Sequence, residues 1–242
     1  MRPLREETVQ ITFDHINGAG ARYKQQVIDL IKMHNASRVC DVGGGANPLL
    51  RDVEISLDYT VLDISPAELA KAPARYKKIQ ADISAENFSC DQRFDVVFTK
   101  ALAEHVSDGE RFHQNIFNIL RPGGFATHFF PTPYALPFIV NRMVPERLGQ
   151  MILAGVAPRD KHLEGKFPAY YRWCGGPTRR QIRRFNRIGF RVVSYAGYFG
   201  HGYYERIPMI RDLEHLKARW LLRHPIAVLA SYASLVLQKP AS

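Results

Sequence analysis

The segment VCDVGGGANP, residues 39–48, places three consecutive glycines just after a carboxylate, where a short apolar run stops. That run, residues 38–42, has the length and composition of a buried strand. In open α/β sheets a ligand lies beyond the carboxyl ends of the strands, and glycine in the first strand-to-helix turn lets backbone N–H groups approach it. The segment therefore predicts a binding turn. A tight turn that holds no ligand is the alternative.

Strand and helix signals alternate around this turn. The helix at residue 65 has a good opening, with Ser65 at the N-cap, Pro66 next and Glu68 two residues later. Alternation with short turns predicts an α/β fold, a parallel sheet with helices on both faces. A chain of 242 residues that is 46% hydrophobic favours a single domain, residues 1–242. The strand-like runs are residues 60–62, 78–81, 94–99 and 125–130, and the helical patterns cover residues 22–33, 65 onward and 109–120.

The alternation of strand and helix signals stops after residue 133. Residues 134–176 are rich in proline, arginine and aromatic residues and show no clean strand, and we interpret them, with residues 200–230, as two cap insertions beside the sheet. Within the second insertion, the helical pattern of residues 210–222 has Leu213, Leu216, Trp220 and Leu221 on one side. The remaining elements expected here are a helix at residues 178–188, capped by Thr178 and ended by Gly189, and strands at residues 190–195 and 233–237.

The positive charge belongs to the second half of the chain. Residues 1–133 hold 15 Lys+Arg against 17 Asp+Glu, net −2, and residues 134–242 hold 18 against 6, net +12. This asymmetry favours an anionic partner: nucleic acid, a phospholipid surface or a phosphorylated substrate. An arginine-rich surface without a partner gives the same count.

Several classes of protein are disfavoured by what the chain lacks. No run reaches the roughly 18 apolar residues of a membrane span, and the first residues lack the apolar stretch of a signal peptide. We therefore expect a cytoplasmic protein, with peripheral association at the inner face of the membrane as an addition. The three cysteines, Cys40, Cys90 and Cys174, have no zinc-ligand spacing, so we expect reduced thiols and no metal site.

The glycine turn and the marks that follow it resemble class I S-adenosylmethionine-dependent methyltransferases. The dinucleotide fingerprint GxGxxG would need glycine where Pro48 stands, which disfavours a nicotinamide site. The pattern is instead acidic-x-Gly-x-Gly-x-Asn, followed in order by Asp63, Asp82 and the turn LRPGG, residues 120–124. The resemblance runs from Arg22 to about Phe130. It implies a seven-stranded, mostly parallel Rossmann-like sheet whose last strand is antiparallel, with residues 22–133 as the cofactor-binding core.

The resemblance also implies the cofactor, S-adenosyl-L-methionine, its product S-adenosyl-L-homocysteine, and a set of residues that bind it. Asp63 would bind the ribose hydroxyls. Asp82 would accept a hydrogen bond from the adenine amino group, and Ile83 would lie on the adenine ring. Asn47 stands in place of the family's third glycine, and asparagine tolerates positive φ better than most residues. The expected cofactor residues are Asp41, Gly43, Gly44, Gly45, Asn47, Asp63, Ile64, Asp82, Ile83, Lys100 and Arg22.

The catalytic candidates come from the strand ends and from the cap. His105 follows the fourth core strand in the sequence LAEHV, and Tyr170 and His201 lie in aromatic, glycine-containing parts of the cap. Such loops commonly line a substrate pocket, although they equally form a small core of the cap. A histidine after a strand is also often packed and hydrogen-bonded, and His128 can be buried by the alternation within its strand.

The sequence defines the methyl acceptor less well than the cofactor. Amine-methylating relatives that act on nucleobases carry Asn/Asp-Pro-Pro-Tyr where this chain has TKAL, residues 99–102, so nucleic acid is less expected than a small molecule. Residues 135–153 mix apolar and arginine side chains as interfacial segments do, and a buried helix gives the same pattern. We expect O-methylation of a small-molecule, sugar or lipid-linked acceptor, with an anionic membrane surface as a candidate partner. The alternatives are an RNA methyltransferase, a nicotinamide-dependent oxidoreductase and a non-catalytic cofactor-binding scaffold, and the oligomeric state is left open.

Overall fold

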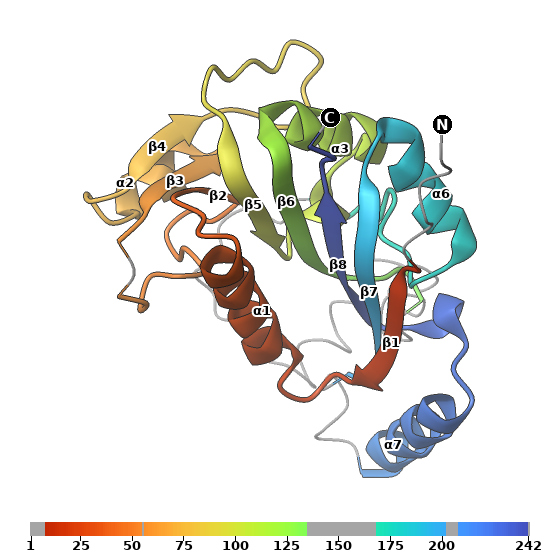
Figure 1. Cartoon of the computed structure of the whole chain (residues 1–242). Coiled ribbons are helices and arrows are strands. Elements are labelled where there is room, and N and C mark those ends of the chain that lie inside the picture. The colour runs from red at the N-terminus through yellow and green to blue at the C-terminus, as the bar shows by residue number, and fades with distance from the viewer. Residues whose placement is uncertain (1–7, 55, 135–167, 202–207, 242) are drawn as a thin grey trace, which may run out of the picture.

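The computed structural model describes residues 8–54, 56–134, 168–201 and 208–241, which form one mixed sheet with helices on both faces (Figure 1). The sheet has eight strands in the order β1-β7-β8-β6-β5-β2-β3-β4. Only β8 runs antiparallel to its neighbours β6 and β7. The strands are β1 (Gln10–His15), β2 (Arg38–Val42), β3 (Asp58–Asp63), β4 (Lys77–Gln80), β5 (Phe94–Lys100), β6 (Leu120–Pro131), β7 (Arg191–Phe199) and β8 (Tyr232–Gln238).

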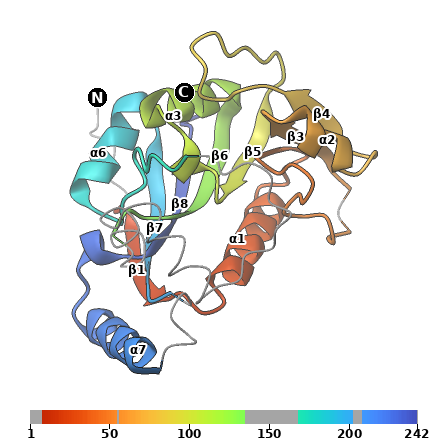
Figure 2. The same cartoon turned by 180° about the vertical axis from the view of Figure 1, so that it is seen from behind.

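The helices divide between the two faces of the sheet. The α1 helix covers the face seen in Figure 1, and α3 and α6 cover the opposite face, seen in Figure 2. The α7 helix lies apart, beyond the lower ends of β1 and β7. The helices are α1 (Ala19–Met33), α2 (Pro66–Lys71), α3 (Gly109–Ile119), α6 (Arg179–Ile188) and α7 (Pro208–Arg223), with short 3-10 turns η1 (Ala103–His105) and η2 (Ala227–Leu229).

The alternation of side chains along β5 explains the two hydrophobic layers. Val96 and Phe98 are fully buried on the α1 side, whereas Val97 is buried on the side of α3 and α6. Each strand residue points to the opposite face from its neighbour, so a continuous apolar run buries both faces of a central strand. The short strand β2 behaves in the same way, with Val39 on the first side and Cys40 on the second.

Local sequence signals set the ends of several helices as expected. The Ser65 hydroxyl accepts a hydrogen bond from the Glu68 N–H at 3.3 Å, and the Thr178 hydroxyl accepts one from Gln181 at the same distance. Gly189 ends α6 with φ 111°, a left-handed conformation that favours glycine. The cysteines are free thiols, as predicted. The α/β class, the mostly parallel sheet and the antiparallel last strand are confirmed.

Three features differ from the expectation. The sheet has an additional strand, β1, which pairs in parallel with β7 at the edge and was not predicted. Strand β3 begins at Asp58, and β7 extends to Phe199. In α7, Leu213, Leu216 and Trp220 are exposed while Leu221 is buried, so the four residues do not share one side. Most of the first cap insertion, residues 135–167, lies outside the described residues, and the division into core and caps stays a prediction.

Candidate functional site

The glycine turn after β2 is built around the buried carboxylate of Asp41. The Asp41 side chain is 3% exposed, and its Oδ2 atom accepts hydrogen bonds from the Tyr59 hydroxyl and the Leu49 N–H, each at 2.7 Å. Burial raises the pKa of this carboxyl to about 6, although the two hydrogen bonds oppose the shift. The carboxylate therefore ties the chain after the glycines back to the end of the strand.

Each glycine of the turn meets a different constraint. A Cβ atom on Gly44 would lie 2.7 Å from the Asp41 carboxyl carbon, which leaves no room for a side chain. Gly43 has φ 77°, in the left-handed region that side chains disfavour, and a Cβ there would lie 2.9 Å from Leu102. Among the described residues, Asn47 is not one of those with positive φ. Asn47 therefore does not need the tolerance of positive φ that asparagine offers, because Gly43 and Gly45 supply the positive φ of the turn.

Two cavities meet at Gly43. The first, of about 340 Å³, lies between the start of α1 and the glycine turn. The second, of about 420 Å³, lies over the ends of β3 and β5 and has Gly43 in its wall as well. The first is lined by Gly20, Ala21, Lys24, Asp41, Gly43, Gly44, Asn47, Pro48, Leu49 and Lys100. The turn thus separates a small polar cavity from a larger one.

The second cavity gathers the residues predicted for the nucleoside. Asp63, Ile64, Asp82 and Ile83 all line it, although they come from two different strand ends. The Asp63 Oδ1 atom accepts a hydrogen bond from the Ser65 N–H at 2.9 Å. The Asp82 Oδ1 atom accepts one from Ser84 N–H at 2.8 Å, the local turn that a carboxylate after a strand commonly forms.

Two of the three catalytic candidates line the same cavity. His105 and Tyr170 both face it, and the Tyr170 side chain is 47% exposed. The His105 Nδ1 atom lies 3.2 Å from the Pro168 carbonyl oxygen. Because a carbonyl only accepts, this contact assigns the proton to Nδ1 and leaves the lone pair on Nε2. A neutral His105 ring with its proton on Nδ1 is the form in which Nε2 can act as a general base.

His201 is placed elsewhere. Its ring is buried, and its Nε2 atom lies 3.1 Å from the Glu214 carboxylate of α7. Among the described residues that line the two cavities, His201 does not occur. His201 therefore connects the end of β7 to α7, and its catalytic role stays a prediction without geometric support.

Arg22 is also engaged away from the glycine turn. Its guanidinium donates to the Asn17 and His15 carbonyl oxygens, each at 2.7 Å, and lies 3.2 Å from the Asp14 carboxylate. Tyr23, the next residue of α1, is buried in the core. Lys100 does reach the first cavity, opposite Gly20 of α1. Lys100, with Lys24, is thus placed to meet a carboxylate there.

Sequence reasoning gave too little weight to Glu104, which lies in η1 between the cavity and the protein interior. The side chain is only 4% exposed, and burial raises its pKa to about 7. Its Oε2 atom has no hydrogen-bond partner in the part of the chain that the structure describes, and Oε1 is 3.9 Å from the His105 Nε2 atom. The preceding Ala101 has φ 54°, a strained value for a residue with a side chain. No residue pattern in the sequence predicts the burial of Glu104 or the positive φ of Ala101.

Comparison with known proteins gives the same assignment as the geometry. Residues 40–127 match the family profile described as a methyltransferase domain. That segment begins in β2 and ends in β6, so it contains the glycine turn and most of the second cavity. Residues 40–127 therefore carry a methyltransferase domain, and the fold is that of class I S-adenosylmethionine-dependent methyltransferases. No curated protein matches the sequence.

Solved structures share the fold of this methyltransferase domain. The N-methyltransferase NodS from Bradyrhizobium japonicum WM9, in complex with S-adenosyl-L-homocysteine, has a TM-score of 0.53 and 13% identity over 91% of this chain and 87% of NodS. A methyltransferase from Clostridium acetobutylicum ATCC 824 has a TM-score of 0.56 and 11% identity over 91% of this chain and 92% of its own. Phosphoethanolamine N-methyltransferase 2 of Haemonchus contortus has a TM-score of 0.53 and 15% identity, covering 89% of this chain and 52% of that one.

The residues of this methyltransferase domain fit the cofactor. The N–H groups of the glycine turn and the side chains of Lys24 and Lys100 suit an amino-acid carboxylate in the first cavity. Asp63 suits a ribose, and the apolar Ile64 and Ile83 suit an adenine ring in the second. The cofactor would therefore span both cavities, across Gly43.

The first test of this placement is Gly44→Ala. Its Cβ atom would push against a carboxylate that Tyr59 and Leu49 hold in place, so we expect about 1–3 kcal/mol lower stability. We also expect at least tenfold weaker binding of S-adenosylhomocysteine, roughly 1.4 kcal/mol, in calorimetry. Gly123→Ala is the control for affinity: Gly123 has φ 82°, so this variant also strains the backbone, but it lies outside both cavities and should leave the affinity unchanged. Unchanged affinity in Gly44→Ala would show that the cofactor does not bind at the turn.

The second test is Asp63→Ala. Removing a charged hydrogen-bond acceptor for the ribose should weaken S-adenosylhomocysteine binding by about 1.5–3 kcal/mol. Asp91→Ala, an exposed carboxylate outside both cavities, is the matched control and should bind like the unchanged protein. Equal affinities of the two variants would show that Asp63 does not hold the ribose.

Proposed function

We propose that this methyltransferase methylates the oxygen of a small-molecule, sugar or lipid-linked acceptor. The observation that carries the proposal is His105, a histidine in the base-competent tautomer on the wall of the second cavity. A hydroxyl needs such a base because it loses its proton as it attacks, whereas a neutral amine can attack first and lose its proton afterwards.

The residues of this chain can hold the methyl donor and accept the proton that the reaction releases. Bound S-adenosylmethionine supplies an electrophilic methyl group on a sulfonium. The acceptor oxygen would take the methyl group as the carbon–sulfur bond of the bound donor broke, and the His105 Nε2 atom would take the hydroxyl proton. The glycine turn and Asp63 hold the donor in line, and the buried surroundings of η1 limit the access of water. Tyr170, on the same wall, would position the acceptor.

A second candidate is transfer to a nitrogen. NodS and the Haemonchus contortus protein are both described as N-methyltransferases, and the same fold serves either acceptor. The exposed arginines of α6 keep an RNA acceptor among the candidates. A nicotinamide-dependent reaction is disfavoured by Pro48 at the position of the fingerprint's last glycine.

The deciding experiment follows the labelled methyl group. The protein is incubated with methyl-labelled S-adenosylmethionine and cell extract separated into lipid, RNA, protein and small-molecule fractions. Label in the lipid or small-molecule fraction, on an oxygen of the purified product, supports the proposal. Label on nitrogen or in RNA overturns it. Absence of transfer to every fraction, together with tight binding of S-adenosylhomocysteine, would favour a non-catalytic scaffold.

A further inference from the structure

Exposed apolar side chains concentrate in one short part of this protein. Of the thirteen exposed large hydrophobic residues that the described chain contains, eight lie between residues 209 and 229. Single exposed apolar residues are ordinary, but a contiguous group marks an interaction site. The eight are Met209, Ile210, Leu213, Leu216, Trp220, Ile226, Val228 and Leu229.

Four of them form a stripe along α7. Met209, Leu213, Leu216 and Trp220 follow each other at intervals of four, three and four residues, which places them on one helical face. Their side chains are 79%, 64%, 58% and 52% exposed. In a helix that only packs against its own protein, the apolar stripe faces the core. Here the stripe faces outward.

The opposite face of α7 holds the helix in place. Ala218 and Leu221 are buried with Phe199 and Ala230, and Phe13 of β1 packs against the same cluster. The buried contact of 3.1 Å between the Glu214 carboxylate and the His201 Nε2 atom joins the same face to the end of β7. The outward stripe is therefore presented on an anchored helix, and turning the helix inward would break these contacts.

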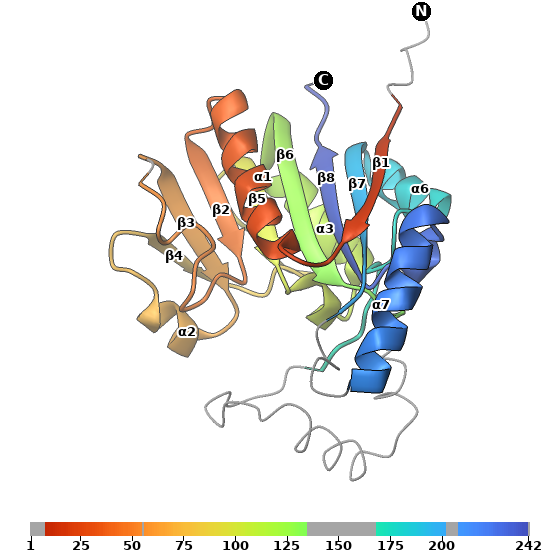
Figure 3. The ribbon, with the colours of Figure 1, turned by 90° about the horizontal axis from the view of Figure 1, so that it is seen from below.

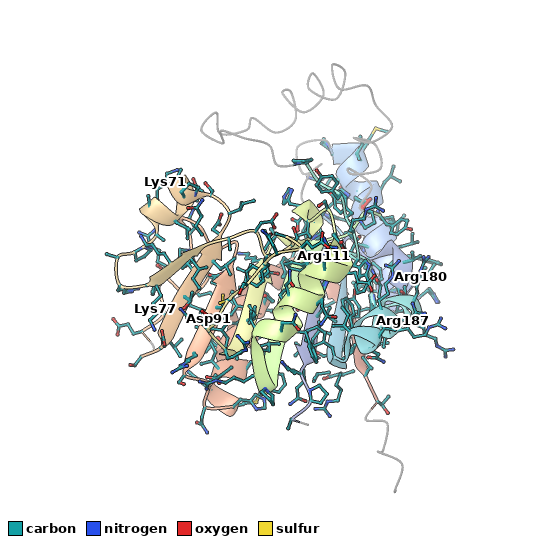
Figure 4. The ribbon with its side chains drawn as sticks, turned by 90° about the horizontal axis from the view of Figure 1, so that it is seen from above. Lys71, Lys77, Asp91, Arg111, Arg180 and Arg187 are labelled. Carbon is teal, nitrogen blue, oxygen red and sulfur yellow. The ribbon has the colours of Figure 1, made fainter. Side chains whose placement is uncertain are left out.

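Basic side chains lie beside the stripe, although α7 also exposes Asp212. Arg219 and Arg223 are exposed along its border on α7. The α6 helix carries five arginines and no acidic residue, and Arg179, Arg180, Arg183 and Arg187 are exposed. Figure 4 shows Arg180 and Arg187 projecting from α6 on the side of the molecule where α7 also lies. The ribbons in Figure 1 and Figure 3 likewise show α6 and α7 on the same side of the sheet. The turn η2, with Val228 and Leu229 exposed, lies between the two helices.

We infer that α7, η2 and α6 form a docking surface for an anionic phospholipid bilayer. A bilayer surface accepts both features at once, since apolar side chains enter the boundary between headgroups and acyl chains while arginines meet the lipid phosphates. A nucleic acid offers phosphates but no medium for a row of exposed leucine and methionine side chains. Tryptophan at the end of the stripe suits the same boundary, where one side of the ring is apolar and the other is hydrated.

The surface has a consequence for the orientation of the enzyme. The α7 helix lies beyond the carboxyl ends of β1 and β7, and the cofactor cavities lie beyond the carboxyl ends of β2, β3 and β5 in the same sheet (Figure 3). A bilayer that meets α7 therefore faces the edge of the sheet where the cavities open. The inference does not depend on which acceptor is methylated, because it concerns binding to lipid alone. Within the described residues, no helix has the length and apolar character of a bilayer span.

Flotation of the whole protein with vesicles tests the surface. We expect binding to phosphatidylcholine vesicles that contain about 30% phosphatidylglycerol, weaker binding without it, and partial loss at about 1 M salt, where exposed charges are screened. Leu213→Glu and Leu216→Glu should each weaken binding at least tenfold, roughly, because each introduces a charge into the apolar boundary. The double variant Arg180→Gln/Arg187→Gln should weaken binding to anionic vesicles by about 30-fold.

Matched controls keep the test decisive. Met33→Glu changes an exposed apolar residue of similar exposure, 68%, on α1, and Lys71→Gln/Lys77→Gln removes two charges at the opposite end of the molecule (Figure 4). Both controls should bind vesicles like the unchanged protein. Three results would overturn the inference: no binding by the unchanged protein, binding that depends on the arginines but not on Leu213, or a lower unfolding temperature for Leu213→Glu than for Met33→Glu. The last result would mean that protein covers the stripe. S-adenosylhomocysteine affinity should be the same in all these variants, which separates this test from that of the proposed reaction.

Discussion

Replacing His105 by glutamine is expected to lower kcat by roughly 100- to 10,000-fold, the usual contribution of a general base. Glutamine can still donate a hydrogen bond to the Pro168 carbonyl, which His105 Nδ1 reaches at 3.2 Å, so the position of η1 should be kept. What the variant loses is the lone pair of Nε2 on the cavity wall. Binding of S-adenosylhomocysteine should therefore change by no more than about twofold, because the base acts on the acceptor rather than on the cofactor.

The split between kcat and KM and a control variant separate a base from a structural residue. A base acts in the chemical step, so the loss in His105→Gln should fall on kcat while KM changes little. His34→Gln, an exposed histidine at the end of α1, should behave like the unchanged protein. A modest loss that disappears as the pH rises would instead indicate an amine acceptor, which loses its own proton to water.

Glu104→Gln is expected to change how stability depends on pH. Burial raises the pKa of the Glu104 carboxyl from 4.5 to about 7, so the folded protein holds a proton that the unfolded chain releases. The stabilisation is fully present below pH 4.5 and is lost as the pH rises through about 7. A shift of this size corresponds to roughly 3 kcal/mol as an upper value. The glutamine variant does not titrate and so avoids this loss.

Denaturant unfolding at about pH 5 and about pH 8 measures the effect. The free energy of unfolding of Glu104→Gln, relative to the unchanged protein, should rise by up to about 3 kcal/mol between the two conditions. Comparing the same pair at two pH values cancels the cost of burying the amide itself. Glu110→Gln, an exposed carboxyl on α3, should show no such change. Parallel pH profiles for Glu104→Gln and the unchanged protein would mean that Glu104 is solvated or paired in solution.

The sequence alone was informative wherever a local pattern has one physical meaning. Ser65 and Thr178 cap their helices, and Gly189 ends α6 in a left-handed conformation. The glycine turn and Asp63 were found because a ligand at the end of a strand needs backbone access and a carboxylate at a set distance along the chain. The resemblance then ordered these marks into one fold, which the family profile over residues 40–127 supports independently.

The reason for the three glycines was only partly visible in the sequence. The expectation of a close ligand explains why the turn lacks side chains, but Gly44 is also required by Asp41, whose carboxyl carbon lies 2.7 Å from any Cβ placed there. That contact exists because Tyr59 of the next strand fixes the carboxylate through its hydroxyl. A constraint from a residue eighteen positions away cannot be read from the motif.

By itself, then, the sequence determined the turn, the helix ends, the sheet class and the cofactor, because each follows from backbone conformation or from residues close along the chain. Tertiary structure decided the rest. It added β1 to the edge of the sheet, paired His201 with Glu214, buried Glu104 behind His105 and turned the apolar stripe of α7 outward. Burial and pairing depend on which distant segments pack together, and a periodic pattern shows that a helix has an apolar face without showing what that face meets.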